Sequence, residues 1–265
     1  MTVTRAELQG GLRALGLEAD DRVIVHSSLS SLGWVEGGAE TVVDALLEVV
    51  GSEGTVMMPT FTTGDAEPFN RAETPSVTGR ITEELRTREG AVRSAHPTHS
   101  VSAVGANAES LTRGHEPANS LGPDSPMHRL IEAGGSILLL GVDHTSNSSV
   151  HIAERLDDLP YRDQTRTATV VDGDGEARTV ITNAVHCSYG FDAVEVVARR
   201  AGLLTEGAID EASVQLMDGQ ALLDELVDVL EAVPNLLLCA DPGCDRCAYA
   251  RERLAEEGLI ELRDD

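Results

Sequence analysis

Apolar and polar residues alternate along the chain in a rhythm that predicts helices between buried strands. The first helix is predicted to begin at Thr4, because Thr4 and Glu7 form a capping box and leucines follow at helical spacing. An apolar run at 21–26 predicts a buried strand, which ends in a small-residue turn at 27–33. The chain therefore opens as an α/β protein does.

The same rhythm continues to the end of the chain. A helix at 39–50 leads to a second strand at 55–60, and residues 64–125 are loop-rich. Further helices are predicted near 78–89, at 127–133, around His151 and Glu154, at 192–201 and at 221–232. The most apolar strand is predicted at 136–142, and an Asp-Gly turn within 170–175 predicts a hairpin. We expect one α/β domain over 1–265, with a cysteine-containing C-terminal segment from about 186.

Composition narrows the classes of function. The chain has 265 residues and a formal charge of −25, and all 20 of its basic residues are arginine. The lack of lysine excludes a P-loop nucleotide site, and such acidity argues against a nucleic-acid partner. We expect a soluble, cytoplasmic protein without a membrane partner, because no 18-residue apolar run and no signal-peptide pattern is present.

The acidic residues are dispersed along the whole chain. A dispersed acidic surface with arginine in place of lysine is typical of a halophile, where carboxylates keep the protein hydrated in concentrated salt. The alternative is an acidic cleft that attracts a polycationic ligand. Net charge does not separate the two interpretations.

The turn after the first strand is a candidate anion site. Four serines and a glycine in 27–33 offer backbone N–H groups, and a predicted helix N-terminus lies downstream. This arrangement suits a pyrophosphate. The alternative is an ordinary solvated turn between a strand and a helix.

His151 and Glu154 are a candidate general base and its partner. On a helix they are three residues apart and share one face. A carboxylate beside an imidazole sets its tautomer and raises its basicity. The alternative is a surface pair that contributes a few tenths of a kcal/mol.

Two further groups could bind metal. His96 and His99 have H-x-x-H spacing, but Pro97 disfavours a helical pair, so a loop that lines the substrate site is the preferred interpretation. Four cysteines, with C-x4-C-x2-C spacing in the last three, suit a closed structural zinc site. Unpaired buried thiols are the alternative. The cysteines are Cys187, Cys239, Cys244 and Cys247.

Several motifs in a fixed order resemble the aminoglycoside 3-N-acetyltransferase family. They are H-S-S-L-S-S-L-G from 26, M-P-T-F-T from 58, H-P-T-H-S-V-S-A-V-G from 96, S-P-x-x-x-L from 125, L-L-L-G-V from 138 and N-S-S-V-H-x-A-E from 147. The resemblance covers about residues 8–166. It implies a mixed central sheet flanked by helices, distinct from the GNAT fold, and direct acetyl transfer from acetyl-coenzyme A to an amine.

The resemblance also implies roles for individual residues. His151 would be the general base, Glu154 would orient it, and Thr60 would contact the thioester oxygen or assist the departing thiol. The remaining implied contacts are the pyrophosphate at Ser27, Ser28, Leu29 and Ser30, and the substrate at His96, His99 and Asn147.

Two alternatives stay open. One is a metal-dependent hydrolase built from His96, His99, His151 and Glu154, and the other is a zinc-stabilised binding protein without catalysis. The acceptor amine also stays open, as does the oligomeric state, for which a homodimer is one option.

Overall fold

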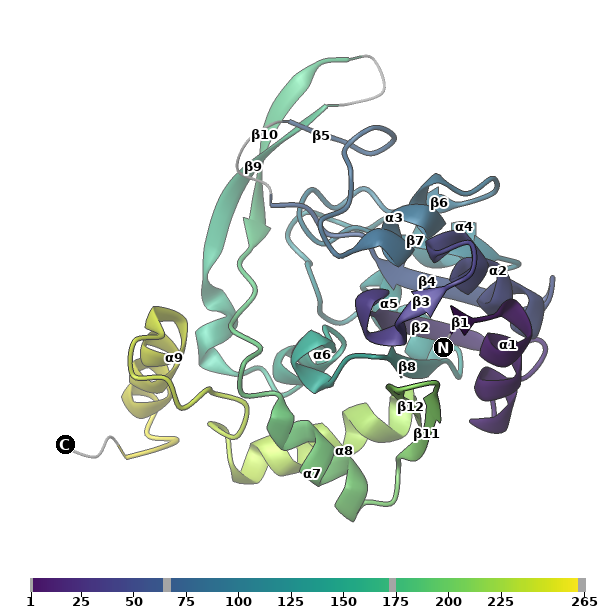
Figure 1. Cartoon of the computed structure of the whole chain (residues 1–265). Coiled ribbons are helices and arrows are strands. Elements are labelled where there is room, and N and C mark those ends of the chain that lie inside the picture. The colour runs from purple at the N-terminus through teal and green to yellow at the C-terminus, as the bar shows by residue number, and fades with distance from the viewer. Residues whose placement is uncertain (1, 64–67, 172–174, 262–265) are drawn as a thin grey trace.

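A mixed seven-stranded sheet forms the centre of the molecule (Figure 1). The computed structural model describes residues 2–63, 68–171 and 175–261. The sheet strands, in spatial order, are β11 (Thr205–Ile209), β12 (Ala212–Asp218), β8 (Ser136–Leu140), β2 (Arg22–Ser27), β4 (Thr55–Pro59), β7 (Val101–Gly105) and β6 (Val92–Arg93). β2 pairs in parallel with both β4 and β8, and the outer pairings are antiparallel.

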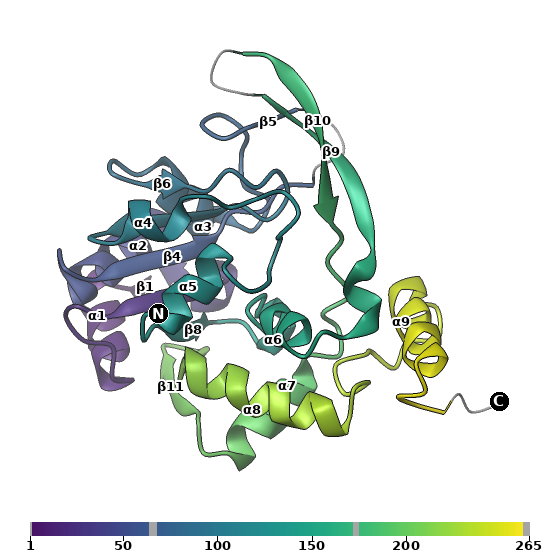
Figure 2. The ribbon, with the colours of Figure 1, turned by 180° about the vertical axis from the view of Figure 1, so that it is seen from behind.

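Helices cover both faces of this sheet, as the expected mixed α/β fold requires. One face carries α1 (Arg5–Ala14), α2 (Ala39–Val50) and α3 (Arg80–Thr87). The other face carries α4 (Ala108–Thr112), α5 (Pro126–Glu132) and α8 (Gly219–Ala232). The chain also forms α6 (Val150–Leu156), α7 (Asp192–Arg200) and α9 (Asp245–Glu256). Of these, α6 lies between the sheet and α9 (Figure 2).

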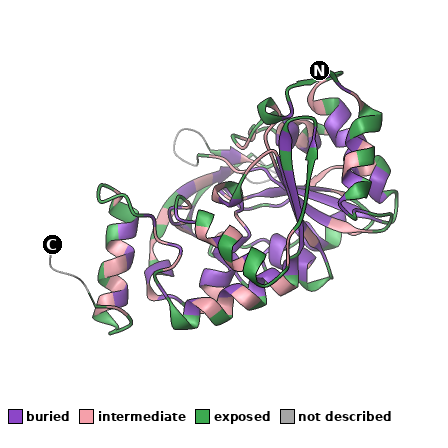
Figure 3. Cartoon of the chain, turned by 60° about the horizontal axis from the view of Figure 1, so that its bottom comes forward, coloured by how far each residue is buried: buried purple, intermediate pink, exposed green. Residues whose placement is uncertain are grey.

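The side-chain alternation of the strands divides the interior into two cores. Val23 and Val25 point into the core under α1 and α2, whereas Ile24 between them points into the core under α5 and α8. All three are fully buried. The central strands are accordingly buried on both sides, and the surrounding helices are buried along one side and exposed along the other (Figure 3).

Two smaller sheets complete the fold. β9 (Thr165–Val171) and β10 (Ala177–Asn183) form the expected hairpin, whose strands extend away from the central sheet, and β5 (Phe69–Asn70) adds to β9 (Figure 1). The predicted Asp-Gly turn at 172–174 lies outside the described residues. The second small sheet pairs β1 (Thr2–Val3) with β3 (Trp34–Val35), and short 3-10 turns are η1 (Ser30–Leu32), η2 (His144–Ser146) and η3 (Pro160–Asp163).

The predicted helices and buried strands are confirmed to within a few residues, including the capping box of Thr4 and Glu7. The prediction did not include β7, β11, β12 or α9, nor the short elements β1, β3, β5, β6 and α4. β12 extends the central sheet because it pairs antiparallel with β8. Within the described ranges, no helix combines the length and the apolar character needed to cross a bilayer.

Candidate active site

The candidate site lies where the parallel strands end. β2 runs into the serine turn, β4 runs into Thr60 and Phe61, and β8 runs into the segment that begins α6. The carboxyl ends of parallel strands meet at one edge of a sheet, which is where ligands bind in open α/β proteins. Residues 27–30, 60–61 and 143–154 therefore come together although they are far apart in sequence.

His151 and Glu154 form a buried dyad on α6. The Nδ1 atom of His151 lies 2.6 Å from Oε2 of Glu154. A carboxylate only accepts hydrogen bonds, so Nδ1 carries the proton and Nε2 is left as the basic atom. The imidazole also packs edge-on against Phe191, with ring centroids 4.8 Å apart. The surface-pair alternative is wrong, because only 4% of His151 and 1% of Glu154 are exposed.

Two residues that follow α6 hold the carboxylate of Glu154. The hydroxyl of Tyr161 donates a hydrogen bond of 2.9 Å to Oε1, and Nη1 of Arg162 lies 3.3 Å from Oε2. Both side chains are buried. A charged carboxylate in an interior needs such partners. Glu154 is thereby fixed in position behind the imidazole.

The electrostatics of the dyad favour a neutral imidazole and a charged carboxylate. Burial lowers the pKa of His151, although Glu154 opposes this effect. Burial alone would raise the pKa of Glu154, but the charges of His151 and Arg162 and two hydrogen bonds outweigh it and lower that pKa. A histidine that is neutral near pH 7 can accept a proton, as a general base must.

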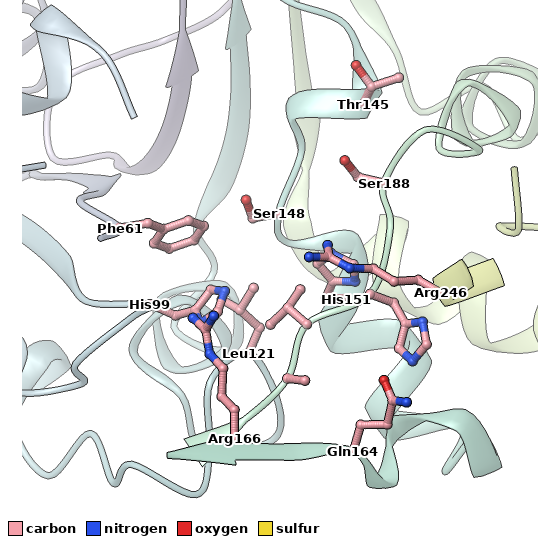
Figure 4. A pocket seen from close by; sticks show the side chains of 13 residues that line it. Phe61, His99, Leu121, Thr145, Ser148, His151, Gln164, Arg166, Ser188 and Arg246 are labelled. Atoms are coloured by element: carbon pink, nitrogen blue, oxygen red, sulfur yellow. The ribbon is translucent and has the colours of Figure 1, made fainter. Parts of the chain in front are cut away.

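His151 lines a cavity of about 390 Å³ (Figure 4). Figure 4 shows Phe61, His99 and Arg166 on one side, and His151, Ser188 and Arg246 on the other. The complete described lining is Phe61, His99, Leu121, Thr145, Ser148, His151, Gln164, Arg166, Ala184, Val185, His186, Ser188 and Arg246. These residues come from seven separate stretches of the chain, so the fold assembles the cavity.

A second cavity, of about 1080 Å³, lies beside the serine turn. Its described lining includes 27–30, Trp34, Val77 and Arg80. The segment after β8 separates the two cavities, because Val142 and Ser146 line this one while Thr145 and Ser148 line the other. The two cavities therefore lie on either side of one short segment, residues 142–148.

Backbone N–H groups make the larger cavity suitable for an anion. Gly38 and Gly79 are the N-cap residues of α2 and α3, both line the cavity, and neither helix has a side-chain cap. Open helix N-termini attract negative charge. Arg80 adds a guanidinium at the start of α3. The expected anion site thus has two helix ends and a cation, beyond the serine turn itself.

The acidic-cleft interpretation of the net charge gains no support here. Among the described lining residues, neither cavity includes a carboxylate, whereas both include arginine. This comparison does not include residues 64–67, which are outside the described residues.

His96 and His99 have different environments. His96 is fully buried; its Nδ1 accepts the N–H groups of Thr98 and His99 at 3.2 and 2.9 Å, and its Nε2 lies 3.0 Å from the carbonyl of Pro117. The ring of His96 therefore organises the loop and does not line either cavity. His99 lines the smaller cavity, and burial lowers its pKa well below the ordinary value.

Thr60 and Asn147 are also fully buried and line neither cavity in the described residues. The hydroxyl of Thr60 donates to the carbonyl of Ser100 at 3.2 Å. The side-chain oxygen of Asn147 accepts the N–H of Ser149 at 3.2 Å and shapes the start of α6. The roles expected for these two residues stay predictions, and their placement favours a structural role.

The four cysteines form one cluster, as their spacing predicted. The sulfur atoms of Cys187, Cys239, Cys244 and Cys247 all lie within 4.8 Å of one another, and none is in a disulfide. The imidazoles of the hydrolase alternative do not make a comparable group. In the part of the chain that the structure describes, the cysteines are the only set of three or more such side chains arranged for a metal.

Sequence reasoning missed several residues of the site. Arg166 and Arg246 line the smaller cavity, and Tyr161 and Arg162 hold Glu154. The last two belong to the Leu-Pro-Tyr-Arg segment directly after α6, so their proximity to the dyad was a usable signal. No local pattern pointed to Arg246, which lies 95 positions beyond His151 in sequence.

Comparisons with known proteins agree with this arrangement. A family model described as aminoglycoside 3-N-acetyltransferase matches residues 24–231. Aminoglycoside N(3)-acetyltransferase VII of Streptomyces paromomycinus is 36% identical over 259 residues, which cover 84% of this chain and 89% of that protein.

Solved structures show the same fold. The apoenzyme of aminoglycoside acetyltransferase AAC(3)-IVa and a mutant of it in complex with gentamicin both give a TM-score of 0.88 at 30% identity, covering 96% of this chain and 98% of theirs. AAC-IIIb in a binary complex with CoASH gives 0.78 at 27% identity, covering 88% and 98%. The expected fold, distinct from GNAT, is confirmed. By its sequence and its fold, the chain belongs to the aminoglycoside 3-N-acetyltransferase family.

Proposed function

We propose that this protein transfers the acetyl group of acetyl-coenzyme A to an amine of an aminoglycoside or a related amine, with His151 as the general base. The observation that carries the proposal is the buried His151–Glu154 dyad on the wall of a cavity. The larger cavity beside it would hold the coenzyme. The AAC-IIIb complex with CoASH and the AAC(3)-IVa complex with gentamicin support these two ligand classes.

The chemistry needs one base and good positioning. Nε2 of His151 would accept a proton from the amine as its nitrogen attacks the thioester carbonyl carbon. The C–N bond forms and the C–S bond breaks, and the sulfur of coenzyme A leaves and takes up a proton. Glu154 would hold the imidazole in the required tautomer and stabilise its positive charge after proton transfer. Because a thioester is already activated, orientation supplies much of the remaining acceleration.

The larger cavity fits the proposed coenzyme. The open N-termini of α2 and α3 and the guanidinium of Arg80 would bind phosphate groups, with the backbone of 27–30 beside them. Trp34 lines this cavity, is 74% exposed, and is the only tryptophan of the chain. Its fluorescence therefore reports on ligand binding at this position alone.

The test measures coenzyme A release from acetyl-coenzyme A, in molar KCl, with a panel of aminoglycosides and simple amines. We expect release that depends on the amine, and a loss of about 10²- to 10⁴-fold in kcat for His151→Ala. Tryptophan fluorescence measures acetyl-coenzyme A binding in parallel. Release without any amine dependence, or no change of fluorescence with coenzyme, contradicts the proposal, and the second result favours a binding protein without catalysis.

A further inference from the structure

Three segments that are distant in sequence meet at the cysteine cluster. Cys187 follows β10, Cys239 follows α8, and Cys244 and Cys247 lie at the start of α9. The first two of these segments pack closely: a Cβ at Gly190 would lie 2.5 Å from the carbonyl of Leu237 and 2.8 Å from the nitrogen of Cys239. Only a residue without a side chain permits this approach. The backbone is therefore shaped to bring these thiols together.

The geometry of the four sulfur atoms suits a tetrahedral ion. Zinc–sulfur bonds of about 2.3 Å place the sulfurs of a tetrahedral site about 3.8 Å apart. The four sulfurs here all lie within 4.8 Å of one another, and three of the four cysteines are buried. Disulfides would need sulfur separations of about 2.0 Å and would use the thiols in pairs. All four cysteines are free.

Backbone and charged groups around the cluster support thiolates. The N–H of Tyr189 donates to the sulfur of Cys187, and the N–H of Cys239 donates to the sulfur of Cys247, both at 3.4 Å. The guanidinium of Arg251 donates to the carbonyl of Cys239 and adds positive charge beside the cluster. Such outer contacts offset the charge that four thiolates and one divalent cation leave.

The cluster adjoins the wall of the smaller cavity through residues next to the cysteines in sequence. Cys187 stands between His186 and Ser188, and both of these line the cavity that contains His151. Arg246, between Cys244 and Cys247, lines it as well.

A chain of contacts leads from the cluster to the dyad. Nε2 of His186 lies 2.6 Å from the carbonyl of Tyr161, whose hydroxyl binds Glu154. Tyr249 on α9 stacks on His186 and donates a hydrogen bond of 2.7 Å to Asp163 in η3.

We propose that Cys187, Cys239, Cys244 and Cys247 bind one Zn²⁺ as four thiolates, and that this ion holds Ser188 and Arg246 in the wall of the acceptor cavity. Each thiol releases its proton to solvent as its sulfur binds the ion. The site is structural, because four protein ligands leave no open position. The acceptor cavity is the smaller cavity, which would hold the acceptor amine. That assignment rests on the proposed function, whereas the metal site does not. The family model ends at residue 231, before three of the four ligands.

The first test measures the metal directly. We expect elemental analysis of the purified chain to find about one zinc per chain, and Cys247→Ser to lose most of it. Tyr189→Ala is the matched control, because Tyr189 lies two positions from a ligand but is 76% exposed. If the serine variant does not fold, the native chain is stripped by a chelator under reducing conditions and given Co²⁺. The absorption of tetrahedral Co²⁺–thiolate then reports the site. A purified chain without zinc that also gives no such spectrum with Co²⁺ overturns the proposal.

The second test probes the wall. Gly190→Ala should weaken zinc retention because its Cβ forces the two cysteine segments apart, whereas Gly243→Ala, with no neighbour closer than 3.4 Å, should not. In the stripped chain, we expect hydrogen exchange to increase in peptides 184–190 and 159–163 but not in 22–33. The KM for the acceptor should rise about tenfold or more, with little change in the KM for acetyl-coenzyme A. Unchanged hydrogen exchange at 184–190 after removal of the metal overturns the proposed link between the ion and the cavity wall. This result can be obtained even if no acceptor is turned over, so it is distinguishable from a failure of the proposed function.

Discussion

Glu154 accepts the Nδ1–H of His151 at 2.6 Å while both side chains are almost completely removed from solvent. A histidine and a glutamate at the same spacing on an exposed helix face would interact weakly, because water screens their charges. In the interior, the carboxylate accepts the hydrogen bond of the imidazole without competition from water. Tyr161 and Arg162 hold the carboxylate in turn. The dyad's burial is therefore the basis of a prediction about the proposed catalysis.

We expect Glu154→Gln to lower kcat by about tenfold or more, because a neutral amide would not stabilise the imidazolium that the proposed proton transfer to His151 forms. Binding of acetyl-coenzyme A should not change. Glu132→Gln is the matched control, since Glu132 pairs with His128 at 3.4 Å but is on the surface. Equal kcat values for Glu154→Gln and Glu132→Gln would rule out the orienting role.

His96 and His99 should respond differently to substitution. His96→Ala removes the acceptor of two N–H groups, one buried and one partly buried, so we expect the free energy of unfolding to fall by about 1–3 kcal/mol. His99→Ala removes a side chain that lines the smaller cavity and should raise the KM of the acceptor. Urea unfolding and steady-state kinetics of both variants measure this. The reverse assignment, with His96→Ala changing only KM, would contradict the structure.

Gly141 packs closely against the serine turn. This residue has φ of 70°, and a Cβ there would lie 2.8 Å from Cβ of Ser31. We expect Gly141→Ala to weaken acetyl-coenzyme A binding, measured by Trp34 fluorescence, because it displaces the turn. Gly134→Ala is the control: its φ is 80°, but no atom lies within 4 Å of the added Cβ. If both variants bind the coenzyme alike, the turn does not contribute to its site.

Buried histidines should make the fold sensitive to mild acid. Burial lowers the pKa of His26 to about 3 and that of His115 to about 4. Below an unfolded pKa of about 6.5, the unfolded chain binds protons that the folded chain does not, so stability falls as pH falls from 6.5. Each such histidine costs about 2 kcal/mol at pH 5.

Urea unfolding in molar KCl, at pH 7.5 and pH 5, measures this loss while salt screens the acidic surface. His26→Gln should reduce the difference between the two free energies of unfolding, since the variant has no titrating imidazole at position 26. An undiminished difference in that variant would show that His26 does not contribute.

The net charge of −25 predicts a salt requirement. Repulsion between surface carboxylates is screened by salt, so the melting temperature should rise as KCl increases toward molar concentrations. Thermal melts across a KCl series measure it. A melting temperature independent of KCl would remove the halophile interpretation.

The amino-acid sequence alone determined the features that depend on near neighbours. The capping box of Thr4 and Glu7 and the shared face of His151 and Glu154 follow from helical spacing, which is a property of a few residues. The apolar runs at 21–26 and 136–142 predicted the central strands because a strand buried on both faces is apolar along most of its length. The order of the motifs was sufficient to indicate the family.

Only the tertiary structure decided which distant residues share a site. β12 joined the sheet through pairing with β8, and Arg246 reached the cavity because the cysteine segments converge. It also separated His96, whose ring nitrogens are both engaged, from His99, which lines the cavity. Local sequence does not encode these contacts, because they depend on how segments far apart in the sequence pack together when the chain folds.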